Sequence, residues 1–207
     1  MAVCAPFAAW WGRMEVEGLE TLPRSGPVLV AGNHDSNMDP VAIGVAARRR
    51  RQVRALAKSS LWDMRGLGPI LDGMGQIPIE RGTGDRGALD RAIAALREGA
   101  CIGVFPEGTR SLGRELRARS GIGHLAAAVP ESRIVLVAVS GTTDYVRFPK
   151  RPRVNVRFSL PAEGDYRPGE DHTAFAARLV DELRAGVPRT IAGRRPKAPA
   201  AEEPRVE

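Results

Sequence analysis

Short apolar runs, each ending in a cluster of polar residues, constrain this 207-residue chain more than any other feature of its sequence. The clearest runs are Val28 to Ala31, Cys101 to Phe105 and Ile134 to Val139. Runs of this length that are rich in apolar and β-branched residues are typical of buried strands. Segments with helical periodicity alternate with the strands, which predicts one α/β domain with a mixed, largely parallel central sheet flanked by helices.

The remaining elements follow from side-chain periodicity. Asp39 is expected to cap a helix that runs to Ala47, with Pro40 at its first position. Residues 61–74 mix helical periodicity with glycines and are expected to be irregular, and Pro78 restricts its strand to a sheet edge or a bulge. Further strands are expected at 14–17, 53–57, 76–79 and 154–158, and further helices at 86–98 and around the apolar face formed by Phe175, Leu179, Val180 and Leu183.

Both ends of the chain differ from the predicted domain, which covers residues 13–186. Residues 1–12 are apolar and contain two tryptophans, which is typical of an interfacial anchor, although a short segment that packs on its own domain explains the pattern equally well. Residues 187–207 are expected to be disordered because they lack periodicity. No uncharged apolar run approaches the roughly 20 residues that span a bilayer, so membrane contact is expected to be peripheral.

The net charge of +7 and the pI near 10.4 predict attraction to polyanions. Phosphate metabolites, anionic lipids and nucleic acids all fit this charge, but the aromatic residues that single-strand binders place among their basic residues are missing. A non-catalytic basic module whose binding depends strongly on salt is the alternative to an enzyme. Cys4 and Cys101 are far apart and the histidines stand singly, so neither a metal nor another cofactor is predicted.

The strongest local motif is the segment 33–39, where His34 precedes Asp39 by five residues just after a predicted strand. An imidazole can take a proton from a hydroxyl and return it later, while a carboxylate on its other nitrogen fixes the tautomer. His34 is therefore the candidate general base and Asp39 its orienting partner. The alternative is that Asp39 is only a helix cap and His34 a loop residue that binds the backbone.

A second motif, Phe105 to Ser111, follows another predicted strand. Gly108 would let the backbone approach a ligand closely, and the guanidinium of Arg110 can hold a phosphate through paired donors. Glu107 offers an acceptor for a substrate hydroxyl. The alternative is a surface turn with a weak ion pair between Glu107 and Arg110.

Two further cations are candidates for the same ligand. Arg81 ends a third motif, Gly75 to Arg81, and is expected near the same crevice as a second phosphate ligand. Lys58 stands at the end of its own predicted strand. In open α/β sheets ligands bind beyond the carboxyl ends of the strands, which is where these residues are expected.

Together these motifs resemble the four ordered sequence blocks of the glycerolipid acyltransferase family, which includes the 1-acylglycerol-3-phosphate acyltransferases. The resemblance extends from about Val16 to about Pro161 and implies the fold of glycerol-3-phosphate acyltransferases. The blocks read Asn33-His34-x-Ser36-x-x-Asp39, Gly75-x-Ile77-Pro78-Ile79-x-Arg81, Phe105-Pro106-Glu107-Gly108-Thr109-Arg110-Ser111 and Val135-Leu136-Val137-Ala138-Val139-Ser140-Gly141-Thr142.

The resemblance implies a reaction, in which a fatty acyl group passes from acyl-CoA or acyl-carrier protein to the hydroxyl of lysophosphatidate. It implies a dyad of His34 and Asp39, phosphate binding by Arg81 and Arg110, and acceptor contacts by Glu107 in the block that also contains Gly108 and Thr109. Glycerol 3-phosphate or an amino-lipid are alternative acceptors. The expected partners are the acyl thioester, the lysophospholipid and the cytoplasmic face of the cell membrane, with no nucleic acid.

The sequence departs from the family pattern at several positions. Leu136 stands where a proline is common, and Ser120 stands where a lysine is common. Asp35 and Asn37 occupy positions that are often basic and bulky or apolar. The first two departures predict altered contacts with the acyl chain or the acyl donor. The other two mean that the resemblance implies the reaction type more firmly than the identity of the acceptor.

Overall fold

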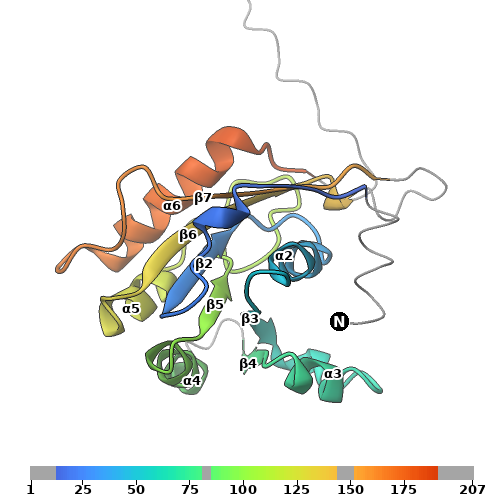
Figure 1. The fold of residues 1–207 in the computed structure, drawn as a ribbon, viewed down its shortest axis with the longest axis horizontal. Coiled ribbons are helices and arrows are strands. Elements are labelled where there is room, and N and C mark those ends of the chain that lie inside the picture. Colours follow the sequence, from blue (N-terminus) through green and yellow to red (C-terminus); the bar gives the residue numbers. More distant parts are fainter. Residues whose placement is uncertain (1–12, 81–84, 144–151, 191–207) are drawn as a thin grey trace, which may run out of the picture.

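The computed structural model describes residues 13–80, 85–143 and 152–190, which form a sheet with helices on both faces (Figure 1). The strands are β1 (Glu15–Glu17), β2 (Val28–Gly32), β3 (Val53–Lys58), β4 (Ile77–Ile79), β5 (Cys101–Val104), β6 (Arg133–Ser140) and β7 (Asn155–Ser159). The helices are α2 (Asp39–Ala47), α3 (Gly68–Gly73), α4 (Arg86–Arg97), α5 (Gly121–Ala128) and α6 (His172–Gly186), with short 3-10 turns η1 (Leu19–Thr21) and η2 (Ser59–Leu61).

The seven strands form one sheet in the order β1-β7-β6-β2-β5-β3-β4. Every neighbouring pair is parallel except β6 and β7, which are antiparallel. This confirms the predicted α/β class with a mixed, largely parallel sheet. Because β2, β3, β5 and β6 run in the same direction, the loops that follow them leave the sheet at one edge, where ligands bind in folds of this type.

Both faces of the central strand β2 are buried, and its side chains enter two different cores because they alternate along the strand. In β2, Leu29 and Ala31 face the core that includes α4, α5 and α6, whereas Val28 and Val30 face the core beneath α2. Figure 1 shows α5 and α6 on one side of the sheet and α2 on the other. A strand enclosed in this way needs apolar residues throughout, which explains the continuous run that marks β2 in the sequence.

Most predicted elements are present with boundaries within about two residues, and Pro78 lies in β4 at the sheet edge as predicted. Three details differ. The helix α5 was not predicted, because Gly121 and Gly123 lower its helix propensity. It forms because its packing against α6 and the sheet compensates for that low propensity. A short helix, α3, lies in the segment that was expected to be irregular. Helix α2 is preceded by Met38 as N-cap, so Asp39 is its first residue and not its cap.

The two terminal segments are mostly outside the described residues. The predicted anchor at 1–12 lies wholly outside them, as do residues 191–207 of the predicted tail. Residues 187–190 are described and contain no helix or strand. Among the described helices, none combines the length and the apolar character required to span a membrane.

Helix α5 packs so closely on the start of α6 that its middle glycine has no room for a side chain. A Cβ on Gly123 would lie 2.6 Å from backbone atoms of His172, whereas a Cβ on Gly121 would meet nothing within 4 Å. We therefore expect Gly123→Ala to lower the free energy of unfolding by about 1–3 kcal/mol through overpacking. Gly121→Ala should leave it unchanged or raise it by up to about 1 kcal/mol. Urea denaturation of both variants measures the difference, and equal stabilities would contradict this packing.

Candidate active site

The loop between β2 and α2 brings the imidazole of His34 onto the carboxylate of Asp39. His34 Nδ1 lies 3.1 Å from Asp39 Oδ2, and the two residues are 5% and 0% exposed. A neutral imidazole that donates Nδ1–H to the carboxylate keeps its lone pair on Nε2. The pair therefore has the geometry in which Nε2 can accept a proton and Asp39 can stabilise the resulting imidazolium.

Asp39 is held by more than the histidine. Its Oδ2 also accepts the backbone N–H groups of Asp35 and Ser36, each at 2.7 Å, and its Oδ1 accepts the hydroxyl of Thr142. The carboxylate therefore organises the loop instead of capping the helix. This rules out the alternative in which Asp39 is only an N-cap.

The loop is also tied to the neighbouring strand β6. The side-chain amide of Asn33 donates to the carbonyl of Val139 at 2.9 Å and accepts the N–H of the same residue at 2.7 Å. Because an amide pairs with both polar groups of one backbone residue, the chain leaves β2 in a defined direction. His34 therefore starts from a rigid point of the sheet.

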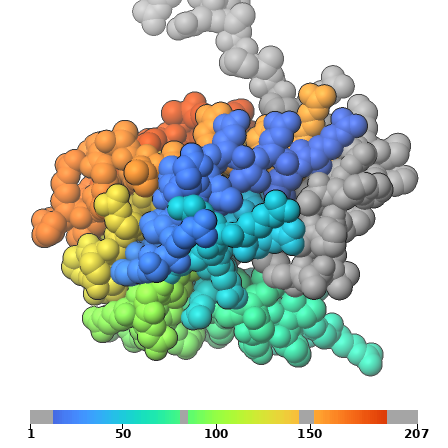
Figure 2. All heavy atoms as spheres, viewed as in Figure 1, coloured from blue at the N-terminus to red at the C-terminus, as the bar shows by residue number. Residues whose placement is uncertain are grey.

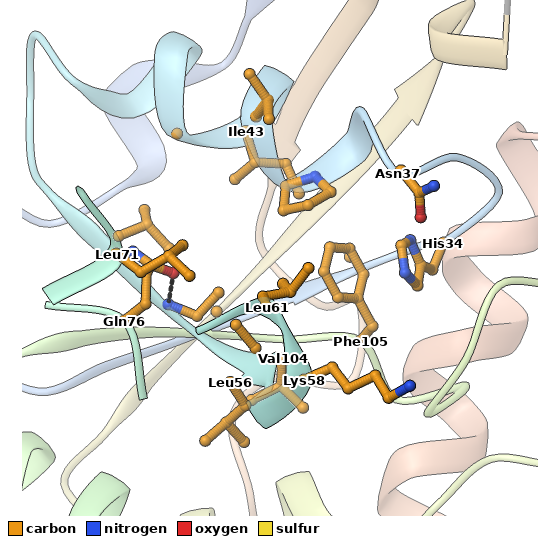
Figure 3. Close-up of a pocket in the computed structure, with 18 of the residues that line it drawn as sticks. His34, Asn37, Ile43, Leu56, Lys58, Leu61, Leu71, Gln76, Val104 and Phe105 are labelled. Atoms are coloured by element: carbon orange, nitrogen blue, oxygen red, sulfur yellow. Dashed lines mark hydrogen bonds between the residues drawn. The ribbon is translucent and has the colours of Figure 1, made fainter. Parts of the chain in front are cut away.

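A cavity of about 740 Å³ opens beside His34. In Figure 3, His34, Asn37 and the amine of Lys58 lie at one side of it, while Leu71 and Gln76 lie at the other. The walls between them come from α2, β3, β5 and the segment that contains α3, and most of these residues are apolar. They include Ile43, Ala55, Leu56, Ala57, Leu61, Met64, Leu67, Met74 and Val104.

Phe105 forms part of this wall and supports the imidazole. Its ring stacks on His34 with a centroid distance of 4.2 Å and an interplanar angle of 19°. The ring also lines a second hollow of about 130 Å³, next to Gly108 and Arg119. Phe105 therefore lines both hollows and fixes one face of the imidazole.

The structure brings several of the predicted ligand residues to the main cavity. Lys58, Thr109 and Arg110 line it together with His34, so a cationic end and an apolar end belong to one space. Gly108 is exposed, and its positive φ of 73° is a conformation that glycine adopts readily. Arg81 lies outside the described residues, so its role as a phosphate ligand stays a prediction.

Glu107 has surroundings that differ from the sequence-based expectation. It is only 2% exposed, and its carboxylate is bound within the protein by the guanidinium of Arg184 and the backbone N–H of His34. A contact with a substrate hydroxyl therefore does not follow from this arrangement. Arg184 belongs to no sequence motif and reaches the site only through the packing of α6, so no local pattern predicts its place here.

Cys101 is poorly suited to act as a nucleophile. It is buried in β5, and burial raises the pKa of its thiol to about 12, although the nearby Arg51 acts in the opposite direction. The thiol is therefore protonated at neutral pH. Within the described ranges, no group of three or more His, Cys, Asp and Glu residues is arranged to hold a metal ion.

Comparison with known proteins agrees with this architecture. The family model described as Acyltransferase matches residues 13–142, which include β1 through β6 and all the described residues of the His34 loop. The crystal structure of the 1-acyl-sn-glycerophosphate acyltransferase PlsC from Thermotoga maritima superposes with a TM-score of 0.67. The alignment covers 88% of this chain and 74% of that one, at 22% identity, and it shows a shared fold.

Three curated relatives carry the name 1-acyl-sn-glycerol-3-phosphate acyltransferase. The protein of Borreliella burgdorferi is 33% identical over 56% of this chain and 48% of its own length. The protein of Bacillus subtilis is 28% identical over 48% of this chain and 50% of its own length. The alpha form of Bos taurus is 34% identical over 81% of this chain and 60% of its own length. The chain thus spans about half the length of the two bacterial relatives.

The network around Asp39 predicts a difference between two substitutions. Asp39→Ala leaves the buried N–H groups of Asp35 and Ser36 without their acceptor, and each unsatisfied group costs about 1–3 kcal/mol. We expect this variant to lose more than about 2 kcal/mol of unfolding free energy. Asp39→Asn should lose less, because an amide oxygen can still accept both groups. Urea denaturation tests this order, and equal losses would show that the backbone contacts do not stabilise the loop.

Proposed function

Because the chain belongs to the acyltransferase family, we propose that it transfers a fatty acyl group from a thioester donor to the hydroxyl of lysophosphatidate. The observation that carries the proposal is the contact between His34 and Asp39 at the polar side of a largely apolar cavity. This arrangement supports the assignment of His34 as a general base that acts where an acyl chain and a phosphate-bearing acceptor meet.

In the proposed reaction Nε2 of His34 removes the proton from the acceptor hydroxyl, and the oxygen of that hydroxyl attacks the thioester carbonyl. The new C–O bond forms, the C–S bond of the tetrahedral intermediate breaks, and the departing thiolate takes the proton from the imidazolium. Asp39 stabilises the imidazolium through Nδ1–H. Direct transfer fits the protonated state of the Cys101 thiol, which offers no thiolate for an acyl-enzyme.

The apolar part of the cavity suits the acyl chain of the donor. Each methylene group that leaves water for such an environment contributes about 0.8 kcal/mol to binding. A chain that lies along Leu56, Leu61 and Leu71 would bring its carbonyl toward His34, as Figure 3 allows the reader to follow. The donor is acyl-CoA or acyl-carrier protein, both of which are anionic and complement the net charge of +7.

The polar side of the cavity suits the acceptor phosphate. Lys58 and Arg110 supply positive charge to the cavity that His34 lines, and Thr109 supplies a hydroxyl. Arg81 is expected to join them. A guanidinium binds phosphate through two parallel N–H donors, which would orient the acceptor hydroxyl toward the base.

The surface near the cavity suits delivery from a lipid phase. Met64 and Ile70 are 56% and 51% exposed, although both are apolar, and Met64 also lines the cavity. Figure 2 shows the teal segment that contains α3 projecting at the lower right of the molecule. Peripheral contact of this segment with the cytoplasmic face of the membrane would place the cavity next to its lipid substrates.

The first test is the loss of catalysis in His34→Ala. With acyl-CoA and lysophosphatidate the protein should release free thiol and form phosphatidate, and the variant should be at least about 10²-fold slower because it lacks the general base. His124→Ala is the matched control, since His124 is exposed on α5 and does not line the cavity. Thermal unfolding verifies that both variants are folded. A folded His34→Ala protein with wild-type activity would refute the proposed base.

Arg110→Ala tests the phosphate site. We expect the KM for lysophosphatidate to rise by about tenfold or more, because one charge-assisted contact is lost. Monoacylglycerol, which lacks the phosphate, should be used equally by both proteins. Arg114→Ala serves as control because Arg114 is exposed in the same loop but does not line the cavity. An unchanged KM for lysophosphatidate would remove Arg110 from the site, and parallel assays with glycerol 3-phosphate show whether another phosphate acceptor is preferred.

A further inference from the structure

Behind His34 a guanidinium and two carboxylates are buried together. Arg184 of α6 binds Asp35 through Nη1 and Nη2 at 2.9 and 3.0 Å, and it binds Glu107 through Nε and Nη2 at 2.9 and 2.6 Å. The side chains of Arg184, Asp35 and Glu107 are 5%, 4% and 1% exposed. One arginine thus joins the loop after β2 to the loop after β5. Among the described residues of α6, only Arg184 takes part in these ion pairs.

The charges of this cluster depend on one another. Two carboxylates buried side by side would repel each other and lose their hydration, and the guanidinium that binds both offsets these costs. Burial tends to lower the pKa of Arg184, but its hydrogen bonds with Asp35 and Glu107 outweigh this and raise that pKa above its ordinary value. Arg184 is therefore a permanent cation at this position.

The cluster is connected to His34 through the backbone of that histidine. The N–H of His34 donates to Glu107 Oε2 at 3.2 Å, and its carbonyl accepts the N–H of Ser111 at 2.8 Å. The hydroxyl of Ser111 also binds Asp35. The backbone N–H and carbonyl of His34 are therefore both bound by the loop that contains Thr109 and Arg110. Arg184 in turn binds the carboxylate of Glu107, which accepts the N–H of His34.

We propose that Arg184 is a positioning residue, which locks the loop of His34 to the loop of Thr109 and Arg110 so that base and acceptor ligands face the same cavity. The inference rests on the proposed function, since it assigns Arg184 a part in the same transfer without contact to the substrates. The family match ends at residue 142, before α6 begins, so this role lies in a part of the chain that the match does not include. In Figure 3 the reddish ribbon of α6 runs beside the loop that carries His34.

The same helix provides a matched control. Arg178 also lies on α6, is 14% exposed and pairs with Glu170 at 2.7 Å. Its other hydrogen-bond acceptors are the backbone carbonyls of Gly164 and Asp165, in the segment that precedes the helix, and its guanidinium lies over the ring of Phe175 on the same helix. Arg178→Gln therefore removes a largely buried ion pair from α6 without touching either loop of the site, whereas Arg184→Gln removes the lock.

The first readout does not need activity. Amide hydrogen exchange reports the opening of the N–H groups of His34 and Ser111, which the lock protects. We expect Arg184→Gln to accelerate exchange at both by about tenfold or more, and Arg178→Gln to leave both unchanged. Unchanged exchange at His34 and Ser111 in Arg184→Gln would overturn the inference, even if the protein proved inactive on every acceptor tried.

The second readout is steady-state kinetics at a temperature where both variants are fully folded. Loss of alignment at the reacting centre should lower kcat of Arg184→Gln by about 10²-fold, while the KM for the acyl donor stays near the wild-type value. Arg178→Gln should retain the wild-type kcat. A merely stabilising role predicts instead that kcat per folded molecule is unchanged, and that result would overturn the inference.

The two failures can be told apart. If the wild-type protein transfers no acyl group, the proposed function fails and hydrogen exchange alone decides the role of Arg184. If Arg184→Gln does not fold, Arg184→Lys replaces it, because an ammonium retains the buried charge but cannot bind both carboxylates in the paired geometry of the guanidinium. This variant should show the same changes with a smaller kcat loss of about tenfold, and wild-type values in both readouts would again overturn the inference.

Discussion

The carboxylate of Asp39 is the group on which the geometry of the site depends. It is fully buried and accepts hydrogen bonds from the imidazole of His34, two backbone N–H groups and the hydroxyl of Thr142. A buried carboxylate is costly unless such donors surround it, so the loop must fold around it in one way. The contacts that satisfy the charge also orient the histidine, and stability and site geometry therefore arise from the same hydrogen bonds.

The parallel sheet explains why residues far apart in sequence meet here. The loops after β2, β5 and β6 leave at one edge, and the residues after β2 bind strand β6 and both of the other loops. Asn33 binds Val139, Ser111 binds the backbone of His34, and Thr142 binds Asp39. These contacts join the loops at this edge and hold the imidazole of His34 in one position.

The cavity separates two kinds of chemistry along its length. Its apolar side is formed by residues of α2, β3, β5 and the α3 segment, and the cations Lys58 and Arg110 line the same cavity as His34. An amphiphilic substrate is complementary to such a space, because its chain leaves water while its headgroup meets positive charge. The buried cluster of Asp35, Glu107 and Arg184 lies behind this space and links its two loops to α6.

Local sequence determined the α/β class, most strands and the order of the motifs, because side-chain periodicity is a local property. It offered His34 and Asp39 only as a candidate pair, with a helix cap as the alternative. Only the tertiary structure decided the rest. Helix α5 exists because packing overrides the low helix propensity of its glycines, and Asp39 serves the loop and not the helix end because the donors around it include a residue more than 100 positions away. Glu107 is bound by Arg184, a residue that no motif marks, because ion pairs between distant segments depend on how helices pack and not on their sequence spacing.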